Sequence, residues 1–425
     1  NFNGKNIAVI GADSSNTIID GDSSGTVVVF SGTETSTALL KNFKIQNGYD
    51  DSNDGVGGIY CADGANPTLE NLIVSDNIDD FGGNGAGGIS VAPGTGDTLR
   101  IMGSVIRNNS GIWGGGGLLI QGDQTGVTLL TNVYIENNTS NSGGGIMIDG
   151  GVAILDSVTI MNNTAGSGNI TRNIGGGGID ISNATLYLLN STINNNSSGS
   201  DDYGGINGGG IGAYNSTLTI ENTTLTGNTA TGSGGGIYSE SSSVLIENSY
   251  INNNNTQNGQ GGGIYSTTSI TYLIGSIVND NESIGDYGGG IYNTSGQFNI
   301  IESTIQANST NTNAGGIFSE GYLYISRSRI VNNYAGNLTG GVEICCSMTA
   351  EIYNTVIADN NSGNGLVDGI YLNGGAGHLT LKNSILWNSG DSEILFDEEV
   401  SEPWDVNIEY STIKGGEEDI VLNGN

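Results

Sequence analysis

The chain has 425 residues, of which 74 are glycine, only 3 are proline and 35% are hydrophobic; because the apolar residues recur at regular positions, they supply a continuous core and exclude a disordered chain. Ten basic residues face 43 acidic ones, and the net charge of -33 excludes nucleic acid as a ligand and disfavours anionic membranes and polyanionic glycans. No apolar run approaches the roughly eighteen residues that a membrane span requires.

A glycine-rich motif that ends in an apolar residue recurs along the chain. A second motif, approximately N-S-x-I-x-x-N, follows each copy, as in "NVYIENN" from 132 and "NSYINNN" from 248. Two motifs that recur together along the chain predict a repeat architecture. The apolar residue of the first motif recurs at spacings of 25 to 33 residues: Ile59, Ile89, Leu118, Ile146, Ile179, Ile211, Ile237, Ile264, Ile291, Ile317, Val342 and Ile370.

Each repeat contains short stretches of alternating apolar and polar residues, such as "TLTIEN", "SVLIEN" and "HLTLKN". A period of two predicts strands, and the Gly, Asn, Ser and Asp residues between them predict turns. One repeat cannot bury its apolar face alone, whereas stacked repeats can. We therefore predict an all-β fold, a right-handed single-stranded parallel β-helix of roughly fourteen coils. We expect residues 1–425 to form a single domain, as a fragment of a longer secreted protein.

Asparagine runs, such as the four from 252, predict corners of the coil, because Asn tolerates a positive φ and bonds its own backbone. Stacked from coil to coil, these side chains are expected to form hydrogen-bonded ladders.

Variable inserts precede the GGI motifs and carry many of the acids, as in "GYDDSNDGVGG" from 48 and "SGSDDYGG" from 198. Carboxylate oxygens are ligands for Ca²⁺. The predicted Ca²⁺ ligands are Asp50, Asp51, Asp54, Asp201 and Asp202. The alternative is solvated loop charge, since no complete calcium-loop signature appears, and we expect no cofactor to be required.

An aromatic residue follows the apolar residue of many GGI motifs. Tyr238, Tyr265, Tyr292 and Phe318 stand at this position in consecutive repeats. They predict an aromatic ladder with a rise of about 4.8 Å per coil. One interpretation is that stacked rings stiffen the sheet; the other is that the rings bind sugars or a protein partner.

Residues suited to catalysis are scattered. The ten basic residues do not gather at one phase of the repeat, and His378 is the sole histidine. Adjacent acids in loops do not supply the fixed carboxylate separation of glycosidases. We assign no catalytic residue. Of the three cysteines, the neighbours Cys345 and Cys346 are predicted to point to opposite faces of a strand and to remain free thiols, like Cys61. The alternative is a disulfide between the two neighbours.

The GGGI and I-x-x-N motifs resemble the GGA[ILV] and F-x-x-N pairs of chlamydial polymorphic outer-membrane proteins, with Ile where those proteins use Phe. The chain is also similar to secreted bacterial proteins of the pectate-lyase-like superfamily. The resemblance covers essentially the whole chain and implies a parallel β-helix and an extracellular or cell-surface location. It is weak evidence for activity, because this fold carries many functions.

The function that we expect is that of a non-enzymatic structural or adhesive β-helix. It would present its loops and aromatic ladder to glycans or surface proteins, without inserting into a membrane. One alternative is a polysaccharide lyase or glycoside hydrolase on the same fold. Another is a subunit that self-associates into an extracellular filament or surface layer.

Overall fold

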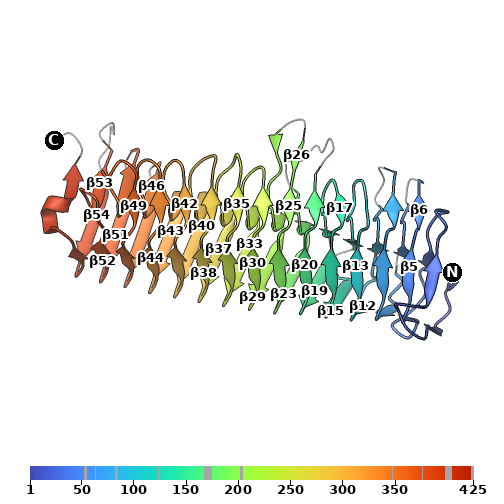
Figure 1. Ribbon diagram of the computed structural model, residues 1–425. Coiled ribbons are helices and arrows are strands. Elements are labelled where there is room, and N and C mark those ends of the chain that lie inside the picture. Colours follow the sequence, from blue (N-terminus) through green and yellow to red (C-terminus); the bar gives the residue numbers. More distant parts are fainter. Residues whose placement is uncertain are drawn as a thin grey trace. The chain divides into compact units, whose positions relative to one another are not determined.

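The computed structural model describes residues 1–51, 55–62, 64–81, 85–122, 125–166, 175–201, 204–346, 348–375, 377–397 and 404–422. The chain divides into two compact units, Asn1–Thr224 (unit 1) and Leu225–Asn425 (unit 2). In each unit, parallel strands pair with the equivalent strands of the next repeat, and the chain forms a β-solenoid of about 14 turns (Figure 1). The predicted fold class is thus confirmed. Within the described residues, no helix has the length and apolar character needed to cross a bilayer.

One coil of unit 1 shows how the repeat folds. It contains β14 (Leu118–Gln121), β15 (Val127–Thr131), β16 (Tyr134–Glu136) and β17 (Thr139–Ser140). Each of these strands pairs in parallel with its counterpart in the following coil, so the strands form four columns. The first column follows the GGI glycines, and the third and fourth flank the asparagine run.

The columns of unit 1 contain the following strands. The first has β3 (Val28–Phe30), β7 (Ile59–Cys61), β11 (Ile89–Val91), β14, β18 (Ile146–Asp149), β22 (Ile179–Ser182) and β28 (Ile211–Tyr214). The second has β1 (Ala8–Ile10), β4 (Leu39–Lys41), β8 (Thr68–Glu70), β12 (Thr98–Met102), β15, β19 (Val152–Asp156), β23 (Thr185–Leu189) and β29 (Thr217–Glu221). The third has β2 (Ile18–Asp20), β5 (Lys44–Gln46), β9 (Ile73–Ser75), β13 (Val105–Arg107), β16, β20 (Thr159–Met161) and β24 (Thr192–Asn194), and the fourth has β17, β21 (Thr164–Ala165) and β25 (Ser197–Ser198). Two short pairs lie beside them, β6 (Tyr49–Asp50) with β10 (Ile78–Asp79), and the antiparallel β26 (Ser200–Asp201) with β27 (Gly204–Gly205).

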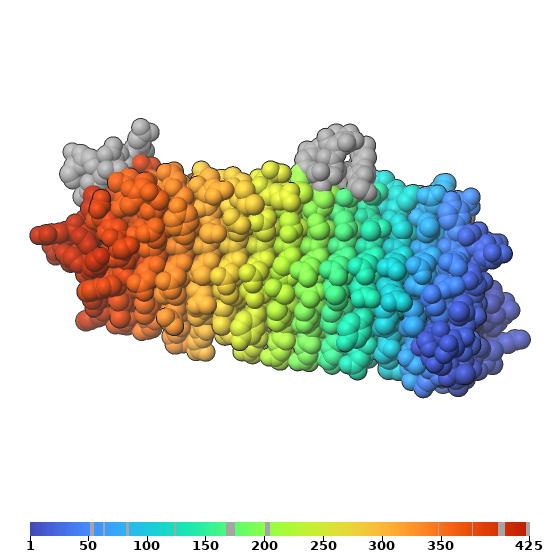
Figure 2. Space-filling view, viewed as in Figure 1, coloured from blue at the N-terminus to red at the C-terminus, as the bar shows by residue number. Residues whose placement is uncertain are grey.

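Unit 2 repeats this plan, and its coils form successive bands from yellow to red in Figure 2. The first column has β32 (Ile237–Glu240), β36 (Ile264–Thr267), β40 (Ile291–Ile301), β43 (Ile317–Ser326), β46 (Val342–Cys345), β50 (Ile370–Asn373), β53 (Ile394–Phe396) and β56 (Ile420–Leu422). The second has β33 (Ser243–Glu247), β37 (Ile270–Ile274), the later halves of β40 and β43, β47 (Thr349–Tyr353), β51 (His378–Lys382) and β54 (Asp405–Glu409). The third has β34 (Tyr250–Asn252), β38 (Ile277–Asn279), β41 (Thr304–Gln306), β44 (Arg329–Val331), β48 (Val356–Ala358), β52 (Ile385–Trp387) and β55 (Thr412–Ile413). The fourth has β31 (Thr229–Ala230), β35 (Asn255–Thr256), β39 (Glu282–Ser283), β42 (Ser309–Thr310), β45 (Tyr334–Ala335) and β49 (Asn361–Ser362). Strand β30 (Thr224–Thr226) contains the boundary between the two units, and the short helix η1 (Gly416–Asp419) precedes β56.

The core of each unit is the column of inward-facing residues that the alternation predicts. In unit 1 the apolar residue of the GGI motif pairs from coil to coil, as Ile89 does with Leu118 and Leu118 with Ile146, and all three are fully buried. Unit 2 continues the same rule in Ile264, Ile291 and further repeats. Because each coil buries one layer of these side chains against the next, the apolar face of an interior repeat is covered by its neighbours.

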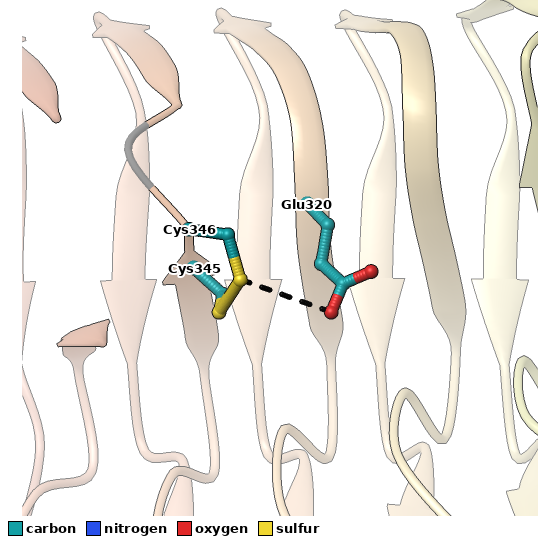
Figure 3. Close-up of side chains that lie close together, drawn as sticks. All are labelled: Glu320, Cys345 and Cys346. Atoms are coloured by element: carbon teal, nitrogen blue, oxygen red, sulfur yellow. Dashed lines mark hydrogen bonds between the residues drawn. A yellow bond between two sulfur atoms is a disulfide. The ribbon is translucent and has the colours of Figure 1, made fainter. Parts of the chain in front are cut away.

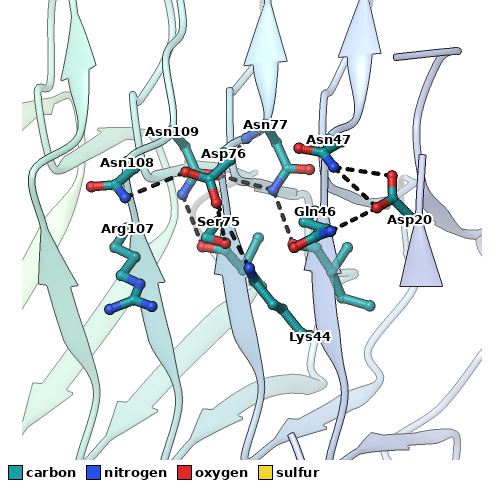
Figure 4. Close-up of polar contacts among 12 residues, drawn as sticks. Asp20, Lys44, Gln46, Asn47, Ser75, Asp76, Asn77, Arg107, Asn108 and Asn109 are labelled. Atoms are coloured by element: carbon teal, nitrogen blue, oxygen red, sulfur yellow. Dashed lines mark hydrogen bonds and ion pairs between the residues drawn. The ribbon is translucent and has the colours of Figure 1, made fainter. Parts of the chain in front are cut away.

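Asparagine ladders, the other predicted feature, run along the corner between the third and fourth columns. In unit 1 the Asn77 Nδ2 donates to Asn109 Oδ1 at 3.0 Å (Figure 4). Asn109 Nδ2 in turn donates to Asn138 Oδ1 at 3.0 Å. Each Oδ1 also accepts the backbone N–H of the preceding ladder residue. The residue before each ladder asparagine often has a positive φ, such as Asn108 at 53°, which explains the doubled asparagines of the motif.

Candidate functional site

The predicted aromatic ladder forms on the outward side of the first column in unit 2. Tyr238 and Tyr265 stack with ring centroids 5.0 Å apart, Tyr265 and Tyr292 at 5.1 Å, and Tyr292 and Phe318 at 4.9 Å. The planes differ by 4° to 10°. This spacing follows from the distance between neighbouring strands, so ring faces lie against ring faces within the protein.

The inserts before the GGI motifs cover much of this ladder. Tyr287, from one insert, stacks on Phe318 with centroids 4.8 Å apart, and Ala314, from the next, packs fully buried in the same cluster. Tyr238 is 7% exposed, Tyr292 5% and Phe318 4%. Stiffening of the sheet, one of the two roles considered for the ladder, therefore accounts for this geometry. Tyr265 is half-buried, and little of the other three rings remains for a sugar or a protein to contact.

Glu343 takes the position of an aromatic ring in the same column. It lies between Phe318 on β43 and Tyr371 on β50, and its side chain is fully buried. Asn373 Nδ2 donates to Oε1 at 2.9 Å, whereas Oε2 has no hydrogen-bond partner. Burial, together with the charges of Glu320 and Asp397, raises the pKa of this carboxyl to about 7, although the hydrogen bond from Asn373 acts to lower it. The signal in the sequence was "GGVEIC", in which a glutamate replaces the tyrosine of GGIY.

The prediction that Cys345 and Cys346 are free thiols was wrong, because the two residues form a disulfide bond (Figure 3). The prediction assumed that both residues continue a strand and alternate between its faces. Strand β46 instead ends at Cys345, and Cys346 adopts a left-handed conformation with φ of 71°. This turn brings the second sulfur to the side of the first. Cys61 is a buried free thiol, as predicted.

A second group of tyrosines lies on the outward side of the second column in unit 2. We call it the tyrosine face; its members are Tyr272 on β37, Tyr322 and Tyr324 on β43, and Tyr353 on β47. Tyr272 and its neighbour Ile270 are 37% and 48% exposed, and the other three tyrosines are half-buried. The sequence analysis missed this surface, although the alternation in "ITYLI" and "GYLYIS" places these tyrosines opposite the buried Leu273 and Leu323.

Polar groups hold the tyrosine face in place. Tyr322 Oη donates to Glu351 Oε1 at 3.2 Å, and Tyr353 Oη donates to Glu351 Oε2 at 3.0 Å. The rings of Tyr324 and Tyr353 meet at 5.9 Å with a 45° tilt. Burial, together with the neighbouring Glu351, raises the pKa of Tyr322 to about 12, so its phenol keeps its proton at neutral pH. The face therefore combines flat apolar rings with a carboxylate fixed by hydrogen bonds.

Of the five predicted calcium ligands, the structure describes the side chains of Asp50 and Asp51. Asp50 accepts a hydrogen bond from Thr26 Oγ1 at 3.2 Å, and Asp51 is exposed. Asp54 and Asp202 lie outside the described residues, as does the side chain of Asp201. In the part of the chain that the structure describes, one group of metal-binding side chains comes together, formed by Glu320, Cys345 and Cys346. Calcium binding at the aspartates stays a prediction. Thermal unfolding with and without a chelator tests it.

Several basic residues are engaged by acids of the adjacent coil. Lys41 pairs with Glu70 at 2.6 Å, and Arg327 pairs with Glu302 at 2.8 Å. His378 Nδ1 lies 3.0 Å from Asp405 Oδ2. These pairs join neighbouring coils on the surface and contribute little to stability.

Comparison of this chain with family models, with curated proteins and with solved structures finds no match.

Proposed function

We propose that the protein is a non-enzymatic, extracellular adhesive scaffold whose unit 2 binds an uncharged polysaccharide on the tyrosine face. The observation that carries the proposal is a group of tyrosine rings, one exposed and three half-buried, on neighbouring parallel strands beside a carboxylate held in register. Tyr272, Asn299, Tyr324 and Glu351 follow one another across β37, β40, β43 and β47. Aromatic faces stack on sugar rings, and the carboxylate oxygens of Glu351 can accept hydrogen bonds from sugar hydroxyls. Asn299 is 5% exposed, and its amide is bonded to Thr271 and Gln297 within the protein.

Charge narrows the ligand class. The net charge of -33 repels polyanionic glycans, and Glu351 lies within the face. An uncharged polysaccharide has no such repulsion and presents the apolar ring faces that tyrosines contact. The repeating sugar units of such a chain also suit a surface that itself repeats from one coil to the next.

The aromatic ladder is a weaker candidate for the same role. Its rings stack on one another and lie beneath the inserts, so a sugar would have to displace Tyr287 and its neighbours. We assign the ladder a stiffening role and the tyrosine face the binding role.

The test is retention on a panel of neutral and acidic polysaccharides by affinity electrophoresis, with released oligosaccharides measured in the same samples. We expect retention by neutral polymers without products. The double variant Tyr272→Ala/Tyr324→Ala should weaken retention at least tenfold. The matched control, Tyr134→Ala/Tyr250→Ala, removes two tyrosines that are 52% and 50% exposed on the third columns and should leave it unchanged.

Three outcomes would contradict the proposal. An equal loss of retention in both double variants would mean that the polysaccharide binds elsewhere on the protein. If no polymer retains the protein, a polysaccharide is not its ligand. Release of oligosaccharides would favour the lyase or hydrolase alternative. Light scattering of the same samples tests the filament alternative, because end-to-end association raises the particle mass.

A further inference from the structure

The Cys345–Cys346 disulfide lies on the outer side of unit 2, at the end of β46. Cys345 is buried against Tyr292, Ala314 and Phe318, whereas Cys346 is exposed. A soluble reductant can therefore reach the Cys346 sulfur without unfolding of the coil. The remaining cysteine, Cys61, belongs to the core of unit 1.

A carboxylate from the adjacent coil faces this disulfide. Glu320 on β43 has Oε1 3.9 Å from Cys346 Sγ (Figure 3). While the disulfide is intact, this sulfur carries no proton, so the contact is not a hydrogen bond. Thr294 Oγ1 donates to the other oxygen, Glu320 Oε2, at 3.0 Å. The threonine thereby orients the carboxylate with Oε1 toward the sulfurs, as outer hydrogen bonds orient metal ligands in other sites.

The surroundings favour a cation. Glu343, two residues before Cys345, carries a buried Oε2 without a hydrogen-bond partner, and Asp397 and Glu320 contribute negative charge to its environment. Within the described residues, none of the recorded ion pairs supplies a positive charge to these three carboxyl groups. A bound divalent cation would offset that charge.

We propose that reduction of the Cys345–Cys346 disulfide creates a binding site for a thiophilic divalent cation of the Zn²⁺ class, with Glu320 as the third protein ligand. A dithiol or a phosphine supplies two electrons, the S–S bond breaks, and each sulfur takes up one proton. The dithiol becomes a disulfide, or the phosphine becomes its oxide with oxygen from water. Cation binding then releases the two thiol protons to solvent.

The geometry of the ligand atoms fits this chemistry. The two sulfurs and the Glu320 oxygen already lie within 4.8 Å of one another. In a tetrahedral zinc site, bond lengths of about 2.3 Å to sulfur and about 2.0 Å to oxygen place sulfur and oxygen roughly 3.5 Å apart and two sulfurs roughly 3.8 Å apart. Glu320 is thus nearly in place, and reduction has only to let the sulfurs separate. Thiolate ligands select Zn²⁺ over Ca²⁺ or Mg²⁺, and the fourth position stays open to water.

The test uses Co²⁺ as a spectroscopic probe on the full chain, either oxidised or reduced with a phosphine under anaerobic conditions. We expect the reduced protein to bind one Co²⁺ with a near-ultraviolet thiolate-to-metal charge-transfer band, which Zn²⁺ abolishes by displacement. The oxidised protein should show no such band. Absence of the band after reduction, or an equal band before it, would overturn the proposal. So would a disulfide that resists reduction in the folded chain, measured by mass after alkylation.

Variants separate the ligands. Cys346→Ser should remove the charge-transfer band, and Glu320→Gln should weaken Co²⁺ binding about tenfold while retaining the band. Glu282→Gln, which neutralises an exposed glutamate on β39, controls for the loss of one negative charge and should bind as the unaltered chain does. If Cys346→Ser fails to fold by circular dichroism, Glu320→Gln carries the test. Unchanged affinity in Glu320→Gln would exclude Glu320 as a ligand and overturn the three-ligand site.

Discussion

Glu393 closes the asparagine ladder of unit 2 by taking the place of the next asparagine after Asn388. The backbone N–H of Asn388 donates to Glu393 Oε1 at 2.6 Å, and its Nδ2 donates to Oε2 at 2.7 Å. In every earlier rung of this ladder, from Asn254 to Asn360, a single Oδ1 of the following asparagine accepts both bonds. A carboxylate thus satisfies the last rung, although burial raises the pKa of the Glu393 carboxyl against the effect of these bonds.

Removal of this acceptor should destabilise unit 2. We expect Glu393→Ala to lower the free energy of unfolding by about 2–3 kcal/mol, because two buried donors of Asn388 lose their acceptors. Glu393→Gln should cost less, since one amide oxygen can still accept. Urea unfolding followed by circular dichroism measures both. Glu418→Ala, at an exposed site of η1, is the control, and an equal effect there would show that Glu393 does not cap the ladder.

The interior of the ladder should be at least as sensitive. Asn308 is fully buried, accepts from Asn281 N and Nδ2, and donates to Asn333 Oδ1 and to the Val278 carbonyl. We expect Asn308→Ala to lower the free energy of unfolding by about 3 kcal/mol, because several buried groups lose partners together. The exposed Asn337→Ala should change it by less than about 0.5 kcal/mol. If the two variants have the same urea midpoint, the ladder does not stabilise the protein.

The covered aromatic ladder predicts a large packing effect. Tyr292 stacks between Tyr265 and Phe318 and is nearly buried. Tyr292→Ala should lower the free energy of unfolding by about 3–5 kcal/mol, the usual cost of removing a buried ring. Tyr250→Ala, where the ring is half exposed, should cost less than about 1 kcal/mol. Equal losses in thermal and urea unfolding would mean that the stacked rings do not stiffen the sheet.

A buried carboxyl in unit 1 predicts a pH dependence. Asp79 is 1% exposed, and burial raises its pKa to about 6 from an ordinary value near 3.8. Because the folded pKa lies above the unfolded one, the protonated form favours folding. That contribution is complete below about pH 4, and about 3 kcal/mol of it is lost as the pH rises through 6.

Asp79→Asn should therefore be more stable than the unaltered chain at pH 8, and the difference should vanish below pH 4. Urea unfolding across this range, in the presence of a chelator, measures it. Asp149→Asn, at an exposed site of β18, controls for the loss of one charge. A stability difference for Asp79→Asn that does not vary with pH would contradict the shifted pKa.

The sequence by itself determined the coil. The GGI spacing, the alternation within the strands and the asparagine runs are local patterns. Each pattern predicts which residue of the next coil is the neighbour, because every repeat stacks on a copy of itself. The register of Ile264 on Ile291, the ladder of Asn254 to Asn388 and the ring spacing of Tyr238 to Phe318 all follow from that rule.

Only the tertiary structure decided which outward surfaces stay open. The inserts fold back over the first column of unit 2 and cover Tyr292 and Phe318, while the second column leaves Tyr272 exposed. Alternation assigns a residue to a face and says nothing of what another segment lays over that face. The disulfide has the same origin. A single left-handed residue, Cys346, interrupts the alternation and joins two sulfurs that a continuous strand would hold apart.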